Sequence, residues 1–316
     1  MKTFTLNDGN VIPAFGLGTW KSKPGLVTQS TKEALKIGYR HIDAAWIYQN
    51  EQEVGKGIHE AIAQNIIKRE ELFVTSKLWN TFHQPEAVEK GCKETLDALG
   101  LDYLDLYLMH WPIAFKPGRE QHKTADDFIS VTDLPISKTF EAMAQLREKG
   151  LVKSVGVSNC GISNLEKVIN ESGIVPAMNQ VELHPYNPQN ELLKYCSNKG
   201  IHMTAYSPLG SGDRPDSMKQ KNEPPLLENN TVKSAAEKEG LTPAQLLITW
   251  AIDRGTVAIP KSTNAERIAE NLAAASHDLS DEARESLDNI GIQHRFVTVD
   301  SWFIPGVTYT GESFWG

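Results

Sequence analysis

The sequence has few cysteines and no long apolar run. Its three cysteines, Cys92, Cys160 and Cys196, lie far apart, with no CxxC pair or Cys/His cluster. Neither a disulfide framework nor a structural zinc site is indicated, and we expect no metal site. No window approaches the ~18 apolar residues of a membrane span, and the N-terminal MKTFTLNDGN lacks the apolar core of a signal peptide. We therefore expect a cytoplasmic protein that does not enter a membrane.

The chain also lacks an excess of positive charge and a glycine-rich dinucleotide fingerprint. Its net charge of -8 over 316 residues argues against nucleic acid as a partner. Residues 16–20 (GLGTW) follow the first apolar run but lack the third glycine of GxGxxG, which disfavours a doubly wound open sheet. With 40% hydrophobic and 23% charged residues, the chain can bury a sizeable core. One large domain over residues 1–316 is favoured.

What is present is a regular alternation of short apolar runs with segments of helical spacing. The apolar runs, which predict strands, cover residues 15–18, 40–44, 72–77, 103–110, 153–157, 177–182, 202–207 and 256–260. The segments between them include residues 27–37, 51–63, 85–99, 137–149 and 162–169, where apolar residues recur every three or four positions and predict helices. Strands that alternate with crossover helices pair in parallel, so the pattern predicts a (β/α)8 TIM barrel.

Both ends of the chain and two internal stretches depart from this rhythm. Asp8-Gly9 within residues 1–14 predicts a β-hairpin with a two-residue turn, which we expect to plug the bottom of the barrel. Residues 111–135, 210–230 and 292–316 are predicted to form long loops at the C-terminal face of the barrel. There they would shape a pocket.

Four chemically capable side chains fall at predicted strand ends or just beyond them. Asp43 ends the second run, Tyr48 lies on the following loop, Lys77 ends the third run and His110 ends the fourth. The carboxyl ends of all barrel strands meet at one rim, so these four side chains should converge. A single strand-end lysine is usually solvated and a single histidine is more often structural, but the convergence favours an active site.

Several stretches of sequence carry a family resemblance. In chain order they read GYRHIDAAWIYQNEQEVG, TSKLW, YLDLYLMHWP, VGVSN, YSPLG and IPKSTNAERIAEN. With these stretches the chain resembles the aldo-keto reductases of the aldose and xylose reductase type. Within that type, a fungal-type sugar-aldehyde or uronate reductase is one candidate. It implies reduction of an aldehyde to the alcohol with NADPH, or with NADH as the alternative cofactor. The relatives of this kind are mostly monomers, so we expect a monomer.

The resemblance implies Asp43, Tyr48, Lys77 and His110 as the catalytic set. Tyr48 would donate the proton, and a nearby Lys77 ammonium would lower the pKa of its phenol. Asp43 would keep Lys77 charged and aimed, and His110 would orient the substrate carbonyl.

The resemblance also implies the residues that hold the cofactor. Ser158, Asn159 and Gln180 match partners of the nicotinamide carboxamide, and Tyr206 matches the residue that stacks on the ring. The full cofactor set is Thr19, Trp20, Asp43, Ser158, Asn159, Gln180, Tyr206, Ser207, Leu209, Ser211, Asp213, Lys261, Ser262, Thr263, Arg267, Glu270 and Asn271. Its lysine and arginine suit a 2′-phosphate, whereas Glu223, in the unusual insertion DRPDSMKQKNEPPLL, is a candidate partner for the ribose of NADH.

Aromatic residues on the predicted loops form the expected substrate pocket. The substrate-binding set is Trp20, Trp46, Tyr48, Trp79, His110, Trp111, Phe128 and Trp302, although some of these rings could simply pack between loops. A basic cluster of Lys116, Arg119, His122 and Lys123, with Arg295 in the tail, keeps a uronate such as galacturonate open beside neutral aldoses and glyceraldehyde.

Other functions remain open at this level. The same groups would oxidise an alcohol in reverse, as a polyol or glycerol dehydrogenase does. Some relatives are non-catalytic, cofactor-binding regulatory subunits. A barrel hydrolase with a metal is the third alternative, but His110 and His184 alone do not make a ligand set.

Overall fold

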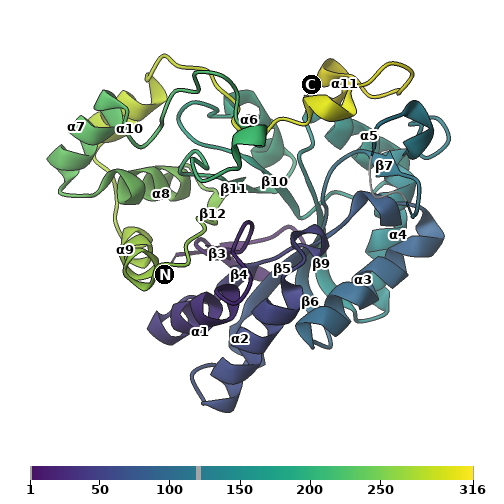
Figure 1. The fold of residues 1–316 in the computed structure, drawn as a ribbon, viewed down its shortest axis with the longest axis horizontal. Coiled ribbons are helices and arrows are strands. Elements are labelled where there is room, and N and C mark those ends of the chain that lie inside the picture. The colour runs from purple at the N-terminus through teal and green to yellow at the C-terminus, as the bar shows by residue number, and fades with distance from the viewer. Residues whose placement is uncertain (1, 119–121, 316) are drawn as a thin grey trace.

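The structure is a computed structural model that describes residues 2–118 and 122–315. In this part of the chain, parallel strands form an eight-stranded sheet in which each strand pairs with the next along the chain (Figure 1). In order, the strands are β3 (Leu17–Gly18), β4 (His41–Asp43), β5 (Phe73–Leu78), β6 (Leu104–Met109), β9 (Val152–Ser158), β10 (Met178–Glu182), β11 (His202–Tyr206) and β12 (Val257–Ala258). The predicted runs contain the core of every one of these strands.

The sheet closes into a barrel through the segment that precedes β3. Phe15 forms a parallel bridge with Ala258, and the backbone N–H of Gly16 donates to the Ala258 carbonyl at 2.9 Å. In return, the Ala258 N–H donates to the carbonyl of Ala14 at 3.0 Å. With both edges joined in this way, the predicted (β/α)8 barrel is confirmed.

Charged residues in the buried strands lie near the strand ends. Strands β5 and β6 are buried along their whole length, as expected for parallel strands covered on both faces. Asp105, near the amino end of β6, accepts hydrogen bonds from Arg69 and Lys153, both at 2.8 Å. Lys77, near the carboxyl end of β5, points to the opposite mouth. The two mouths of the barrel are thus chemically different.

Helices surround the strands (Figure 1). They are α1 (Val27–Ile37), α2 (Glu51–Ala63), α3 (Pro85–Leu99), α4 (Ile136–Glu148), α5 (Ile162–Ser172), α6 (Asn190–Asn198), α7 (Asn230–Glu239), α8 (Pro243–Asp253), α9 (Ala265–Ala274), α10 (Asp281–Asp288) and α11 (Gly311–Trp315). Helices α1 and α3 end at Gly38 and Gly100, whose φ angles of 116° and 66° lie in the left-handed region that glycine tolerates. No helix in the described residues is long and apolar enough to cross a membrane.

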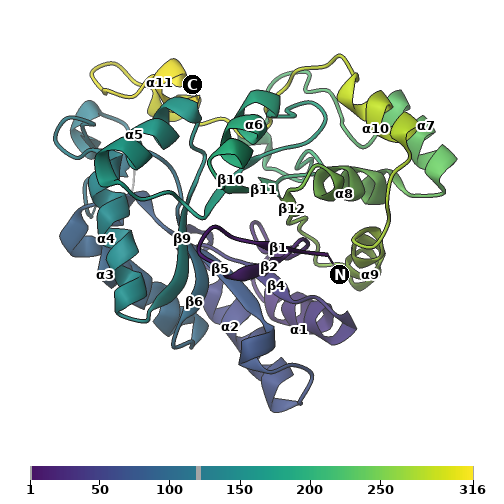
Figure 2. The same cartoon turned by 180° about the vertical axis from the view of Figure 1, so that it is seen from behind.

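A hairpin of β1 (Thr3–Thr5) and β2 (Val11–Pro13) lies across the amino-terminal mouth of the barrel (Figure 2). Its Leu6 and Ile12 pack with barrel residues such as Leu106 and Met178, so the predicted plug is present. The turn is longer than a two-residue one: Leu6 N–H donates to the Asn10 carbonyl at 2.8 Å around three residues, with Gly9 at φ 86°.

The three long stretches gather around the other mouth. Residues 111–135 include the short hairpin of β7 (Ala114–Phe115) and β8 (Phe128–Ile129). The segment between β11 and α7 contains a single 3-10 turn, η5 (Asp216–Met218). In the tail, α11 lies against α5 (Figure 1), where Asn164 Nδ2 donates to the Phe314 carbonyl at 3.0 Å.

Candidate active site

A cleft of about 1040 Å³ opens at the carboxyl ends of the strands. Strand ends form its floor, residues 207–227 (hereafter the strap) form one side, and residues 297–302 form the other. Most of the sequence-predicted site residues line it: Thr19, Trp20, Asp43, Tyr48, Trp79, His110, Trp111, Ser158, Asn159, Gln180, Tyr206, Ser207, Leu209, Ser211, Asp213, Lys261, Ser262, Thr263, Arg267, Glu270, Asn271 and Trp302. A cleft of this volume holds a ligand of cofactor size.

Lys77 joins Asp43 to Tyr48 at the floor of the cleft. Its Nζ donates to Asp43 Oδ1 at 2.6 Å, to the Ala44 carbonyl at 2.9 Å and to Tyr48 Oη at 3.4 Å. Three acceptors match the three hydrogens of an ammonium group, so the group is fixed in orientation. Lys77 is only 1% exposed and lies just behind the residues that line the cleft.

Asp43 is also held by Gln180 of β10, which is not adjacent to β4 in the sheet, and by Thr19, which follows the adjacent strand β3. Gln180 Nε2 donates to Asp43 Oδ2 at 2.7 Å, and Thr19 Oγ1 donates to the Asp43 carbonyl at 2.8 Å. Because both carboxylate oxygens of this buried residue accept a hydrogen bond, its cost of burial is offset.

The environment raises the pKa of Tyr48, which corrects the sequence-based expectation that Lys77 would lower it. Burial of the phenol raises its pKa well above the usual value, and the nearby Asp43 and Glu51 carboxylates act in the same direction. Burial also lowers the pKa of Lys77, although Asp43 opposes that shift. The phenol therefore stays protonated, and Lys77 is placed to stabilise a phenolate only when the proton leaves.

His110 faces the same space as Tyr48. The two rings meet edge to face with centroids 5.8 Å apart, and Trp79 meets His110 in the same way at 5.4 Å. Burial, with a smaller contribution from Lys77, lowers the pKa of His110 well below its usual value, so the imidazole is neutral. Within the described chain, its Nδ1 is buried without a hydrogen-bond partner.

A hydrogen-bonded group lies beside these residues on β9 to β11. Tyr206 Oη donates to Asn159 Oδ1 at 2.7 Å, and Asn159 Nδ2 donates to Ser158 Oγ and to the His110 carbonyl, both at 3.0 Å. These bonds fix the amide of Asn159 and the ring of Tyr206. The group offers a planar aromatic face next to amide and hydroxyl groups, which suits a planar ligand that carries a carboxamide.

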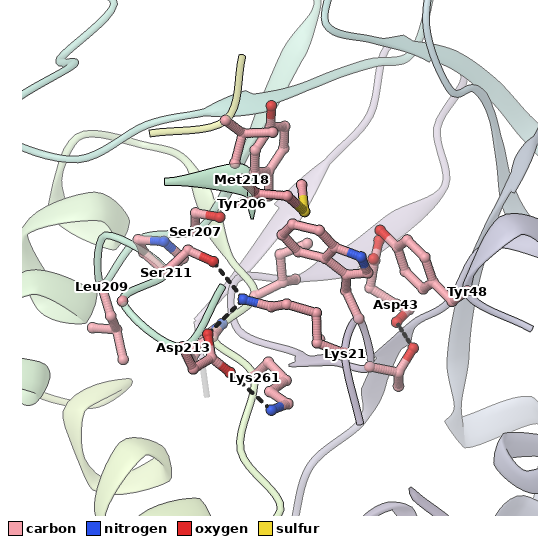
Figure 3. A pocket seen from close by; sticks show the side chains of 18 of the residues that line it. Lys21, Asp43, Tyr48, Tyr206, Ser207, Leu209, Ser211, Asp213, Met218 and Lys261 are labelled. Carbon is pink, nitrogen blue, oxygen red and sulfur yellow. Dashed lines mark hydrogen bonds and ion pairs between the residues drawn. The ribbon is translucent and has the colours of Figure 1, made fainter. Parts of the chain in front are cut away.

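Two lysines, Lys21 after β3 and Lys261 after β12, converge on Asp213 of the strap (Figure 3). Lys21 Nζ donates to Asp213 Oδ1 at 2.5 Å and to Ser211 Oγ at 2.7 Å, and Lys261 Nζ donates to Asp213 Oδ2 at 3.0 Å. Lys21 was missed at the level of sequence, where its only signal is its place directly after the Trp20 that follows the first strand. Two cations that converge beneath a loop form a setting for an anionic ligand.

Helix α9 begins at the far end of the cleft. Its N-cap Asn264 accepts a hydrogen bond from the Arg267 N–H at 2.9 Å, and the exposed Arg267 side chain lies in the first turn. Ser262 and Thr263 precede the helix, and Glu270 and Asn271 follow on it. A helix N-terminus with arginine and lysine beside it suits a phosphate group.

The family model described as "Aldo/keto reductase family" matches residues 14–292. The chain belongs to the aldo/keto reductase family. It is accordingly an NAD(P)H-dependent oxidoreductase, as the resemblance predicted.

Curated relatives match nearly the whole length of this aldo/keto reductase. An aldo/keto reductase of Synechocystis sp. is 45% identical over 100% of this chain and 96% of its own length. Aldo-keto reductase family 1 member A1 of Rattus norvegicus is 44% identical over 97% of this chain and 93% of its own. Among solved structures, the aldose reductase of Schistosoma japonicum superposes with a TM-score of 0.87 at 38% identity, with 96% of each chain covered. A Bombyx mori aldo-keto reductase in complex with NADP gives a TM-score of 0.86 at 38% identity, covering 95% of this chain and 96% of its own.

The structure of this aldo/keto reductase corrects the expected placement of two aromatic rings. Trp46 and Phe128 do not line the cleft. The Trp46 indole donates to Glu94 Oε2 at 3.0 Å on the outside of the barrel. Phe128 packs edge to face on Phe115 at 5.2 Å, and Phe115 in turn lies behind Trp79 and Trp302 of the cleft wall.

The charged residues considered for ligand binding also lie elsewhere. Glu223, the candidate partner of an NADH ribose, accepts hydrogen bonds from Arg214 at 2.5 Å and from the Gln220 N–H at 2.7 Å, which engages both of its oxygens. Of the basic cluster, Arg119 lies outside the described residues, whereas Lys116, His122 and Lys123 do not line the cleft. Arg295 stacks on the Trp315 ring at 3.9 Å.

Proposed function

We propose that this aldo/keto reductase uses NADPH to reduce a small uncharged aldehyde to its alcohol, with Tyr48 as the proton donor. One arrangement carries the proposal: Lys77 donates to Asp43 and to Tyr48 at once, beside a neutral His110 in a cleft of cofactor size. The aldose reductase name of the Schistosoma japonicum neighbour supports an aldehyde as substrate.

NADPH fits the residues of the cleft. Asn159 and Gln180 would hold the carboxamide, and the ring of Tyr206 would support the nicotinamide, which supplies the hydride when bound. Lys21 and Lys261 flank the strap where a pyrophosphate would pass beneath it, and Arg267 at the start of α9 would hold the 2′-phosphate. The NADP complex of the Bombyx mori neighbour supports the same choice of cofactor.

Tyr48 gives its proton to the substrate oxygen. Burial keeps the phenol protonated, so the acid form is present at neutral pH. As the proton leaves, negative charge appears on Oη, to which Lys77 already donates at 3.4 Å. The ammonium therefore stabilises the charged product of proton transfer more than the starting phenol, which is how a fixed charge accelerates a reaction.

His110 orients the substrate. Its neutral ring lies beside Tyr48 and Trp79. An aldehyde oxygen between His110 and Tyr48 would accept a hydrogen bond from the imidazole, and Lys77 would remain the nearby positive charge. Asp43 acts through Lys77, which it keeps charged and fixed.

An uncharged aldehyde fits the wall of the cleft better than an anionic one. The substrate end carries the rings of Trp20, Trp79, Trp111 and Trp302. The exposed carboxylate of Asp300 also lies there and would repel a uronate, while Lys116, His122 and Lys123 do not line the cleft. Open-chain aldoses, glyceraldehyde and aromatic aldehydes match this surface.

An aldehyde panel tests the proposal. Consumption of NADPH, followed by its near-ultraviolet absorbance, should appear with glyceraldehyde, xylose and a substituted benzaldehyde, and should be weak with galacturonate. The same panel with NADH measures cofactor preference. If no aldehyde consumes either cofactor although NADPH binds, the proposed reaction is wrong; a preference for galacturonate would reject the uncharged substrate class.

A further inference from the structure

Arg214 is a buried arginine in the strap, directly after Asp213, to which Lys21 and Lys261 donate. Arg214 is 2% exposed, whereas neighbouring Asp213 is reached by Lys21 and Lys261 from the cleft side. A buried guanidinium is stable only when its donors are satisfied. The partners of Arg214 therefore show what this position does.

Four of the five N–H donors of Arg214 are engaged. Nε donates to the Ser211 carbonyl at 3.1 Å and one terminal nitrogen to the Met218 carbonyl at 3.0 Å, which closes the strap on itself. The other terminal nitrogen donates to Glu223 Oε2 at 2.5 Å. The remaining bond leaves the strap and goes to the carbonyl of Phe296 in the C-terminal tail.

The tail is fixed at that point from both sides. The backbone N–H groups of Phe296 and Val297 each donate to the carboxylate of Glu182 at 2.6 Å, at the carboxyl end of β10. The next residues, Val297 to Trp302, form the substrate wall of the cleft. Phe296 is thus bonded to the barrel by its N–H, which donates to Glu182, and to the strap by its carbonyl, which accepts from Arg214.

The strap also packs directly on the ring of Phe296. The Arg214 guanidinium lies 5.3 Å from the ring centroid. Gly210, at φ 78°, approaches so closely that an added Cβ would lie 3.1 Å from Phe296 Cε2. Little space is left for the strap to move without moving Phe296, because packed groups of this kind shift together.

We propose that Arg214 is a positioning residue that couples the strap over the cofactor to the wall that contacts the substrate. When Asp213 is drawn down between Lys21 and Lys261, Arg214 carries the movement to Phe296 and so to residues 297–302. Opening the strap releases the same wall. The chain would thereby shape the substrate end fully only while the strap is closed. This inference rests on the proposed function only in naming the ligands as cofactor and aldehyde. The link from the strap through Arg214 to Phe296 does not depend on that function.

Hydrogen exchange of the free protein tests the link without cofactor or substrate. Arg214→Lys keeps a positive charge but cannot reproduce the planar set of four donors. We expect amide exchange to become about tenfold faster both in the strap and in residues 296–302, with β6 and α8 unchanged. Glu223→Gln should act in the same direction more weakly. Lys221→Ala, an exposed position of the same strap, is the matched control and should change neither segment.

Three exchange results would overturn the proposal. Faster exchange in the strap alone would show that the tail does not depend on Arg214. No change in either segment would show that the bonds of Arg214 do not restrain them. Equal acceleration in β6 and α8 would mark Arg214 as a general stability residue.

Binding and kinetics give a second, independent readout. In Arg214→Lys, NADPH should dissociate faster by protein fluorescence, and the KM of a bulky aromatic aldehyde should rise about tenfold while that of glyceraldehyde stays nearly constant. Equal rises in both KM values would contradict the coupling. If the unsubstituted protein reduces no aldehyde, the proposed function fails, yet the exchange result still decides whether strap and tail are linked.

Discussion

Lys77 donates to the phenolic oxygen of Tyr48 at 3.4 Å from a position that Asp43 fixes at 2.6 Å. The shorter bond sets where the ammonium points, and the longer one leaves the phenol free to keep its proton. Burial raises the pKa of that phenol, so the ammonium acts on the charge that develops during proton transfer. The predictions below follow from this site and its surroundings.

Removing the Tyr48 hydroxyl should abolish most of the turnover and leave cofactor binding intact. Tyr48→Phe keeps the ring that packs against His110 and Trp20, so the cleft retains its shape. We expect kcat to fall by roughly 10²-fold or more, with the Kd for NADPH unchanged. Steady-state kinetics and a fluorescence titration measure the two quantities. Tyr195→Phe, on α6 away from the cleft, is the control, and turnover close to the unsubstituted value in Tyr48→Phe would remove this residue from the mechanism.

The pH profile should show no histidine ionisation. Burial lowers the pKa of His110 well below 6.5, so the imidazole is already neutral across the ordinary assay range. Tyr48 keeps its proton because its pKa is raised. We therefore expect kcat/KM to stay nearly flat from weakly acidic to weakly alkaline pH and to fall only at high pH. An inflection near the usual histidine pKa that disappears in His110→Gln would contradict the neutral assignment.

Glu51 should make the fold less stable as the pH rises. Its carboxyl, which accepts from Ser76 Oγ at 2.5 Å, is buried, and burial raises its pKa from 4.5 to about 7. The pKa of Glu51 is higher in the folded state than in the unfolded state. Its contribution to the free energy of unfolding is therefore fully present below pH 4.5 and is lost as the pH rises through about 7. The loss amounts to about 3 kcal/mol.

Glu51→Gln tests this sign. The amide still accepts from Ser76 and cannot ionise, so the variant should gain in Tm relative to the unsubstituted protein at weakly alkaline pH and not at acid pH. Glu86→Gln, an exposed position on α3, should show no such difference. A gain that is the same at both pH values, or larger in acid, would reject the ionisation of Glu51 as its cause.

Arg267 should discriminate between the two nicotinamide cofactors. Its side chain is exposed in the first turn of α9, beside Lys261 and Ser262. Arg267→Ala should raise the KM for NADPH by about tenfold and that for NADH by much less, since only NADPH carries the 2′-phosphate. Arg147→Ala, exposed on α4, is the control. Equal effects on both cofactors would show that Arg267 does not contact that phosphate.

Most of the fold could be predicted from the sequence, because each strand and helix of the barrel has its own local hydrophobic pattern. Buried parallel strands must be apolar throughout, so each one is visible as a short run, and Asp43, Lys77 and His110 could be assigned to one rim from strand ends alone. The N-terminal hairpin was predicted from Asp8-Gly9, but the two-residue turn that this dipeptide indicates was wrong. Gly9 closes a three-residue turn, a choice that depends on how Leu6 and Ile12 pack into the barrel mouth.

The site could be predicted only as far as backbone position determines side-chain direction. Trp46 and Tyr48 belong to the same 3-10 turn, η1 (Trp46–Tyr48), and residues two apart in such a turn face different sides. Tyr48 therefore enters the cleft, whereas Trp46 turns outward to Glu94. Lys21 was missed because its partner Asp213 is distant in sequence, and Arg214 was missed because its link to the Phe296 carbonyl joins distant parts of the chain. The raised pKa of Tyr48 was missed because burial cannot be read from a motif.

The hairpin fills the amino-terminal mouth, so in the described part of the chain the barrel opens at the carboxyl ends of its strands. Under the proposed function, cofactor and substrate would both enter and leave at this end, the cofactor beside the strap and the substrate beside the tail. The plugged side, where Asp105 accepts from Arg69 and Lys153, lies at the other end of the strands, so we expect attachment of the protein to a support there to leave the cleft accessible. The rate of turnover should be unchanged by such an attachment.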